Sequence, residues 1–157
     1  MSDTASDTVS DTIIYPEIST LKKHAGWIKY VCIHTMSFQV WTAGAVPRDA
    51  DYNIIEGHGN QFKAVFDDLE SCLNGAGTSI KNAIKIHIFL QDMAVYNDFN
   101  KWYKENIVKK YGDKVRRCVA VGINGQETVV EAEIVAALEE GKYYDMCVEA
   151  VKKRLGI

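Results

Sequence analysis

The segment from Lys114 to Leu138 constrains the fold more than any other part of the chain. Two runs rich in β-branched residues flank Asn124-Gly125. Such a dipeptide is a strong signal for a two-residue hairpin turn, because both turn positions need a positive φ. We therefore predict a β-hairpin whose register opposes Arg116 to Glu133, Cys118 to Glu131, and Ala120 to Val129.

The two faces of the predicted hairpin differ in chemistry. Because side chains alternate across a strand, the three opposed pairs share one face. That face holds an arginine, a thiol and two carboxylates within cross-strand or diagonal reach. The other face is predicted to pack in the core, and it carries Val119, Val121, Thr128, Val130, Ala132 and Ile134.

Two interpretations of the charged face are open. It is either a solvated sheet surface with an Arg–Glu pair, since structural ion pairs also concentrate charge, or a site for a small anionic ligand. In the second interpretation Arg116 clamps a carboxylate through its planar guanidinium. Glu131 or Glu133 then orients or deprotonates a water molecule.

Length and composition indicate one globular domain. The chain has 157 residues, of which 47% are hydrophobic and 25% are charged. The net charge of -3 gives no support for a nucleic-acid partner. No apolar run reaches membrane-spanning length, and the N-terminus lacks the apolar core of a signal peptide. We therefore expect a soluble, cytoplasmic protein that binds no membrane.

The cysteines and histidines argue against a metal site. The four cysteines, at positions 32, 72, 118 and 147, form no Cys-x-x-Cys pair, which favours free thiols in a reducing compartment. The four histidines share no metal-ligand spacing. Cys72 lies on an apolar helical stripe and is expected to be a small core residue.

The chain outside the hairpin predicts further strands and helices. Met1–Thr12 repeats Ser-Asp-Thr three times and is expected to be a disordered tail, followed by a connector over 13–26. An α+β domain is predicted over 13–138, with two core helices on one face of a mixed sheet, and a helical extension over 139–157. The expected strands are Tyr30–Thr35, Phe38–Ala45, a short one at Asn53–Glu56, and Asn82–Leu90. The expected helices are Asn60–Leu73, Asp92–Tyr111 with Asp92 as its N-cap, and Tyr143–Leu155.

Several short motifs stand in a characteristic order along the chain. They are Thr42–Pro47 (TAGAVP), Gln61 near a helix start with Ala76-Gly77 at its end, Phe89–Asp92 (FLQD), Tyr96–Tyr103 with Asn100 inside it, Val115–Val119 (VRRCV) and Val130–Glu133 (VEAE). As an ordered set, they make the segment from Tyr30 to Leu138 resemble the reactive-intermediate deaminase family (RidA, YjgF-like).

The resemblance implies a fold, an assembly and a reaction. It implies a chorismate-mutase-like homotrimer, a trimeric barrel with clefts between subunits. It also implies hydrolysis of imines or enamines of 2-keto acids, which are small carboxylate-bearing substrates, with release of ammonia and without metal or organic cofactor. By this resemblance Arg116 would hold the substrate carboxylate, Glu131 would position the attacking water, Cys118 would sit beside Arg116, and Tyr30, Gly44 and Asn100 would line the cleft.

The chain departs from the family pattern near this cleft. The family's Pro-Ala-Arg-Ser reads Lys114-Val115-Arg116-Arg117, and its Ser-Gly-Gln reads Ala43-Gly44-Ala45. By strand alternation Arg117 is expected to point away from the site. Three functions stay open: an imine or enamine deaminase, a pathway-specific enzyme that hydrolyses or tautomerises a larger unsaturated acid, and a non-enzymatic binding or chaperone-like protein, or a nuclease as some relatives have been described.

Overall fold

The computed structural model describes residues 13–16, 30–35, 37–125, 127–141, 145, 148–149, 152 and 155–157. The polar tail over 1–12 lies outside these residues, and so does most of the predicted helix Tyr143–Leu155. Both therefore stay predictions. No helix within the described ranges is long and apolar enough to cross a membrane.

A six-stranded mixed sheet forms one layer of the fold, with the strand order β1-β2-β3-β6-β4-β5. The β4–β5 pair is parallel and the other pairs are antiparallel. The mixed sheet was predicted, whereas β1 was not, because it is very short and lies in the expected connector. The strands are β1 Ile13–Ile14, β2 Val31–His34, β3 Gln39–Thr42, β4 Ala83–Leu90, β5 Arg116–Ala120 and β6 Val130–Ala137.

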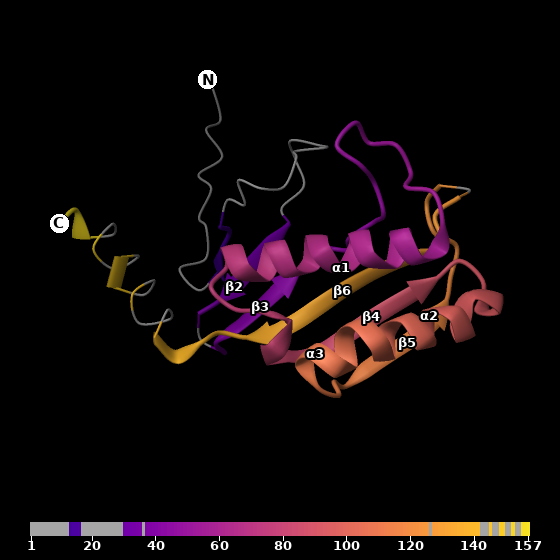
Figure 1. The fold of residues 1–157 in the computed structure, drawn as a ribbon. Helices are drawn as coiled ribbons and strands as arrows, with labels where there is room; N and C mark the ends of the chain where they lie inside the picture. Colours follow the sequence, from indigo (N-terminus) through magenta and orange to yellow (C-terminus); the bar gives the residue numbers. More distant parts are fainter. Residues whose placement is uncertain are drawn as a thin grey trace, which may run out of the picture.

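The helices form the second layer, and Figure 1 shows α1 and α2 on the same side of the sheet. As predicted, Asp92 begins the second helical segment, because its carboxylate accepts a hydrogen bond from the Ala94 amide at 2.8 Å. Gly112, with φ +78°, ends it. The helical elements are α1 His58–Gly75, η1 Ile80–Asn82, η2 Met93–Val95, α2 Tyr96–Tyr103, the π-helix η3 Lys104–Val108 and α3 Lys109–Tyr111.

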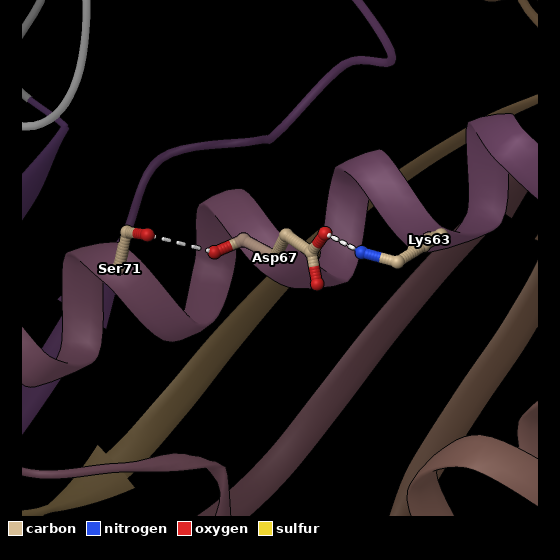
Figure 2. A network of polar contacts seen from close by, with 3 residues as sticks. All are labelled: Lys63, Asp67 and Ser71. Carbon is tan, nitrogen blue, oxygen red and sulfur yellow. Dashed lines mark hydrogen bonds and ion pairs between the residues drawn. The ribbon is translucent and has the colours of Figure 1, made fainter.

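The core lies between the two layers. The apolar stripe of α1 is buried as predicted, including Cys72, which is 5% exposed. Aromatic rings join α1 to α2, and Phe62 meets Phe99 edge to face at 5.2 Å. The outer side of α1 is polar: Figure 2 shows the Lys63–Asp67 ion pair and the bond from the Ser71 hydroxyl to the Asp67 carbonyl.

The predicted β5–β6 hairpin is wrong, because β4 lies between the two strands. The helical segment over 93–111, which contains α2, connects β4 to β5. The three elements form a β-α-β unit, in which the two strands lie side by side and parallel. β6 then pairs with the other edge of β4. Gly125 has a positive φ, at +105°, but Asn124 does not, so the two-residue hairpin turn is absent.

Two glutamines hold the segment between β5 and β6 in its observed path. The side-chain oxygen of Gln91 accepts from the Ile123 amide at 2.9 Å. The buried Gln61 accepts from the Val129 amide at 2.9 Å and donates to the carbonyls of Glu127 at 2.8 Å and Ile55 at 2.9 Å. These bonds tie the segment to the end of β4 and to α1.

Burial corrects some side-chain assignments and confirms others. Val119 and Val121 were predicted to be core residues, and this is wrong because the helix-facing side of β5 carries Arg116 and Cys118. Val119 is only partly buried, and Val121 is 40% exposed. Asn53–Glu56 contains an isolated bridge from Ile54 to Arg48 where a strand was predicted. The predicted core residues Thr128, Val130, Ala132 and Ile134 are all buried.

Candidate functional site

Arg116 and Cys118 face the helices. Arg116 pairs with Ile86 on β4, and Cys118 pairs with Ile88. Both isoleucines are fully buried under the helical layer. Because paired residues on neighbouring strands point to the same side of a sheet, Arg116 and Cys118 point toward the helices from the edge strand.

Residues of α2 surround the Arg116 guanidinium. Its Nη2 donates to the Asn100 Oδ1 at 2.5 Å, and its Cζ lies 4.7 Å from the centroid of the Tyr103 ring. Asn100 and Tyr103 are three positions apart, so they lie on one side of the helix. The structure therefore brings together Arg116 and Asn100, which were both predicted site residues.

No carboxylate in the described part of the chain lies within ion-pair distance of the guanidinium. None of the ion pairs found there includes Arg116. Its Nη1 is buried and has no hydrogen-bond partner. A buried donor without a partner is rare and costly, so this nitrogen marks a place where an acceptor is missing.

Burial also perturbs the neighbouring titratable groups. It raises the pKa of the Cys118 thiol, while the charge of Arg116 acts in the opposite direction. Burial likewise raises the pKa of the Tyr103 hydroxyl; the charge of Arg116 opposes this shift, and the charge of Asp113 adds to it. Both groups are therefore protonated at neutral pH, and Cys118 is not a ready thiolate.

Glu131 and Glu133 point to the open face of the sheet, away from the helices. Glu133 pairs with His87 across the strands, and its carboxylate lies 2.9 Å from the His87 Nδ1. Burial and the neighbouring charge of Glu133 raise the pKa of Glu131. The Glu131 carboxylate lies against Gly44, where an added Cβ would be 2.1 Å from its Oε1.

The predicted site residues thus form two groups on opposite faces of one sheet. Arg116, Cys118 and Asn100 lie on the helical side, whereas Glu131 and Gly44 lie on the open side. β5 and β6 are two strand spacings apart, which is about 10 Å. The predicted face shared by Arg116 and Glu131 is therefore wrong for a single subunit, because it depended on the β5–β6 hairpin.

Arg117 takes the position on the open face that was predicted for Arg116. It pairs with His87, which in turn pairs with Glu133. A hollow of about 210 Å³ lies there, lined by His87, Ile88, Phe89, Arg117 and Val119. Tyr30 lies elsewhere, at the start of β2, where its carbonyl accepts from the Ala43 amide at 2.7 Å and its side chain packs against the core.

Two members of these groups were missed from the sequence. His87 was not predicted as a site residue, because its pairing with Glu133 depends on a long-range register. Tyr103 was not predicted as one either, although its spacing from Asn100 could have indicated a shared helix side. Among the described residues, no cluster of three or more side chains suits a metal ion.

A family model described as endoribonuclease L-PSP matches residues 18–138, well over half of the chain. The chain belongs to this family. It is the RidA/YjgF-like family that the ordered motifs indicated, so that prediction is confirmed.

Relatives in this family carry several descriptions. The chain is 29% identical over 99 residues to the 3-aminoacrylate deaminase RutC of Acinetobacter baylyi, an alignment that covers 62% of this chain and 77% of RutC. It is 33% identical over 101 residues to the mitochondrial protein mmf1 of Schizosaccharomyces pombe, covering 62% of this chain and 60% of that protein.

Solved structures of L-PSP family members share the fold. The crystal structure of yeast Mmf1 superposes with a TM-score of 0.72 at 21% identity, covering 82% of this chain and all of that chain. The Rid-family protein YyfA of Yersinia pestis gives a TM-score of 0.72 at 20% identity, covering 80% and 99%. These matches confirm the predicted α+β fold class.

Proposed function

We propose that this protein is a hydrolytic deaminase of small imine or enamine carboxylates, and that Arg116 binds the substrate carboxylate. The observation that carries the proposal is the half-buried Arg116 guanidinium, which Asn100 and Tyr103 hold in place and which has a donor without a partner. A carboxylate fits this group because guanidinium and carboxylate form paired charge-assisted hydrogen bonds.

The reaction needs little beyond orientation and a water molecule. An enamine that takes up a proton at its β carbon becomes a protonated imine. The carbon of a protonated imine is electrophilic, so water adds to it to give a carbinolamine. The carbon–nitrogen bond then breaks, leaving an oxo acid and ammonia. A carboxylate such as Glu131 accepts a proton from the attacking water and returns one to the departing nitrogen. Burial and the charge of Glu133 raise the pKa of Glu131, which makes the carboxylate a better proton acceptor.

The separation of Arg116 from Glu131 is the basis for proposing a homotrimer with sites between subunits. Arg116 lies on the edge strand β5, whose outer edge has no neighbour among the described strands. By the strand registers, the open face carries cations on β4 and β5, at Lys85 and Arg117, and carboxylates on β6, at Glu131 and Glu133. Trp41 on this face is 49% exposed. Docking the edge of one subunit against the open face of the next would bring both groups to one substrate.

Light scattering tests this assembly. We expect a stable trimer at micromolar concentration. A stable monomer that still releases ammonia would contradict the shared site.

Two relatives support a small carboxylate-bearing substrate. RutC is described as a 3-aminoacrylate deaminase, and 3-aminoacrylate is an enamine carboxylate. The Escherichia coli protein TdcF, which shares the fold with a TM-score of 0.64 at 20% identity over 73% of this chain and 91% of TdcF, was crystallised with bound serine.

Ammonia release from freshly generated 2-iminopropanoate tests the reaction. An amino-acid oxidase acting on alanine supplies the imine, and semicarbazide captures whatever imine has not been hydrolysed. We expect the protein to lower the initial rate of semicarbazone formation as its concentration rises, because the imine reacts with semicarbazide faster than the pyruvate formed from it. An unchanged initial rate, with activity on a larger unsaturated acid, would favour the pathway-specific alternative. The family description also names an endoribonuclease, but the net charge of -3 gives a polyanion substrate no support.

Gly44→Ala should reduce turnover with little effect on stability. The new methyl group would occupy the position of the Glu131 carboxylate, which is the flexible end of a side chain and can move away. We expect about a tenfold or greater loss in kcat/KM, because displacement of a reacting group by about 1 Å is costly. Gly59→Ala is the matched control, since a Cβ there meets nothing within 4 Å. Equal activity of the two variants would remove Glu131 from the site.

Cys118→Ser should retain substantial turnover, and Cys118→Ala should retain some. Burial keeps the Cys118 thiol protonated at neutral pH, and water attack on an imine needs no covalent intermediate. Steady-state kinetics, with mass spectrometry of the protein under turnover, measures this. Loss of activity in both variants together with a trapped covalent adduct would require a nucleophilic mechanism.

A further inference from the structure

Two buried polar atoms, on two side chains that contact each other, have no hydrogen-bond partner. They are the Arg116 Nη1 and the Tyr103 Oη, and both are buried. Tyr103 is only 3% exposed, and its ring stacks on the guanidinium that carries the other atom. Just one further side-chain atom in the described ranges is in the same situation, the Thr128 Oγ1. Two of the three therefore belong to one stacked pair.

The Tyr103 hydroxyl is a hydrogen-bond donor throughout the ordinary pH range, because burial raises its pKa. The unpartnered nitrogen of Arg116 is a donor at every pH. A group that satisfies both must therefore be an acceptor. Because none of the ion pairs among the described residues includes Arg116, an anion suits this position best.

The surrounding helix changes geometry at this point. Tyr103 is the last residue of α2, and the π-helix Lys104–Val108 follows it directly. Short π-helical stretches inside α-helices are frequent at functional sites. Here the change in pitch lies next to the residue that covers Arg116.

We propose that Tyr103 is an anion-binding residue, whose hydroxyl acts with the Arg116 Nη1 as a pair of donors for the carboxylate of a small 2-oxo or 2-imino acid. This proposal rests on the proposed function, since it assigns a further residue to the same carboxylate site. The Tyr103 ring has a second role, because it holds the guanidinium plane in position. No role in the reaction was predicted for Tyr103 from the sequence.

The substitution Tyr103→Phe distinguishes a binding role of the hydroxyl from a structural one. It should weaken carboxylate binding without lowering the melting temperature. Phenylalanine keeps the ring over Arg116 and removes a buried hydroxyl that has no partner in the free protein. Removing an unsatisfied buried group does not destabilise the free protein, so the melting temperature should stay the same or rise. The affinity for a carboxylate should fall, on the order of tenfold, with the loss of one donor.

The experiment measures pyruvate binding by isothermal titration calorimetry, together with thermal unfolding of the full chain. Tyr111→Phe is the matched control, since it removes the bond from the Tyr111 hydroxyl to Glu70 farther along the same helical segment. We expect Tyr103→Phe to weaken pyruvate binding about tenfold without lowering the melting temperature. The control should lower the melting temperature and leave pyruvate affinity unchanged.

The outcomes separate this proposal from the proposed reaction. Binding that is lost in Arg116→Ala but unchanged in Tyr103→Phe would overturn the donor pair and leave the carboxylate site standing. Absence of ammonia release, with pyruvate binding weakened in both variants, would overturn the deaminase and support the donor pair. Failure of the unaltered protein to bind pyruvate at millimolar concentration would overturn the donor pair.

Discussion

Arg116→Ala should lower kcat/KM for imine carboxylates by about tenfold to a hundredfold. A bound carboxylate forms charge-assisted hydrogen bonds with the guanidinium, each contributing roughly 1.5–3 kcal/mol. Because about 1.4 kcal/mol corresponds to a factor of ten, losing even one bond gives that range. Arg116→Lys should restore little, since an ammonium group cannot reproduce the planar fork or its stacking on Tyr103. Steady-state kinetics on 2-iminopropanoate measures both variants.

Arg117→Ala is the matched control, because the adjacent arginine lies on the opposite face of the same strand. Arg117 is exposed and pairs with His87 on the open side of the sheet. Its replacement should have a much smaller effect on turnover, provided light scattering shows the same assembly. Abolished activity in Arg117→Ala, with nearly normal activity in Arg116→Ala, would place the substrate in the open-face hollow.

Gln61→Leu should destabilise the fold by about 2–4 kcal/mol. The buried Gln61 side chain bonds to three backbone groups, and leucine would leave all of them without this partner. A lost partner for a buried polar group costs roughly 1–3 kcal/mol, although local relaxation reduces the sum. Urea unfolding measures the change, and hydrogen exchange at the Val129 amide should accelerate first.

Lys63→Ala on the same helix is the control for this change. Its ion pair with Asp67 lies at the surface, where both side chains are more than half exposed, so its loss should cost less than about 1 kcal/mol. Equal stability of Gln61→Leu and Lys63→Ala would show that water replaces the Gln61 bonds.

The elements predictable from the sequence were those set by local pattern. The alternation in Val130–Ile134 identified the buried side of β6, and the spacing from Phe62 to Leu73 identified the buried side of α1. Asp92 was recognised as a cap because capping depends on neighbouring residues alone. Arg116 and Asn100 were placed in one site by the family resemblance, and their side chains do meet.

The prediction was wrong about which strands lie next to each other in the sheet when they are distant in the sequence. The local dipeptide Asn124-Gly125 led to the prediction of a β5–β6 hairpin. The β-α-β order from Asn82 to Ala120 instead favours a parallel pair of β4 and β5, which is what the structure contains. Alternation within β5 was correct, but the partner strand was not. Glu131 was therefore predicted on the same face of the sheet as Arg116, whereas the two side chains lie on opposite faces.

The position of β4 between β5 and β6 also has a consequence for how the chain folds. In the finished sheet both edges of β6 are occupied, by β3 on one side and β4 on the other. Any early pairing of β5 with β6, which the Asn124-Gly125 sequence encourages, must come apart before the sheet is complete. β5, which carries Arg116, therefore reaches its final position by pairing with β4. A whole helical segment separates these two strands in the sequence, whereas β6 is nearer to β5 along the chain.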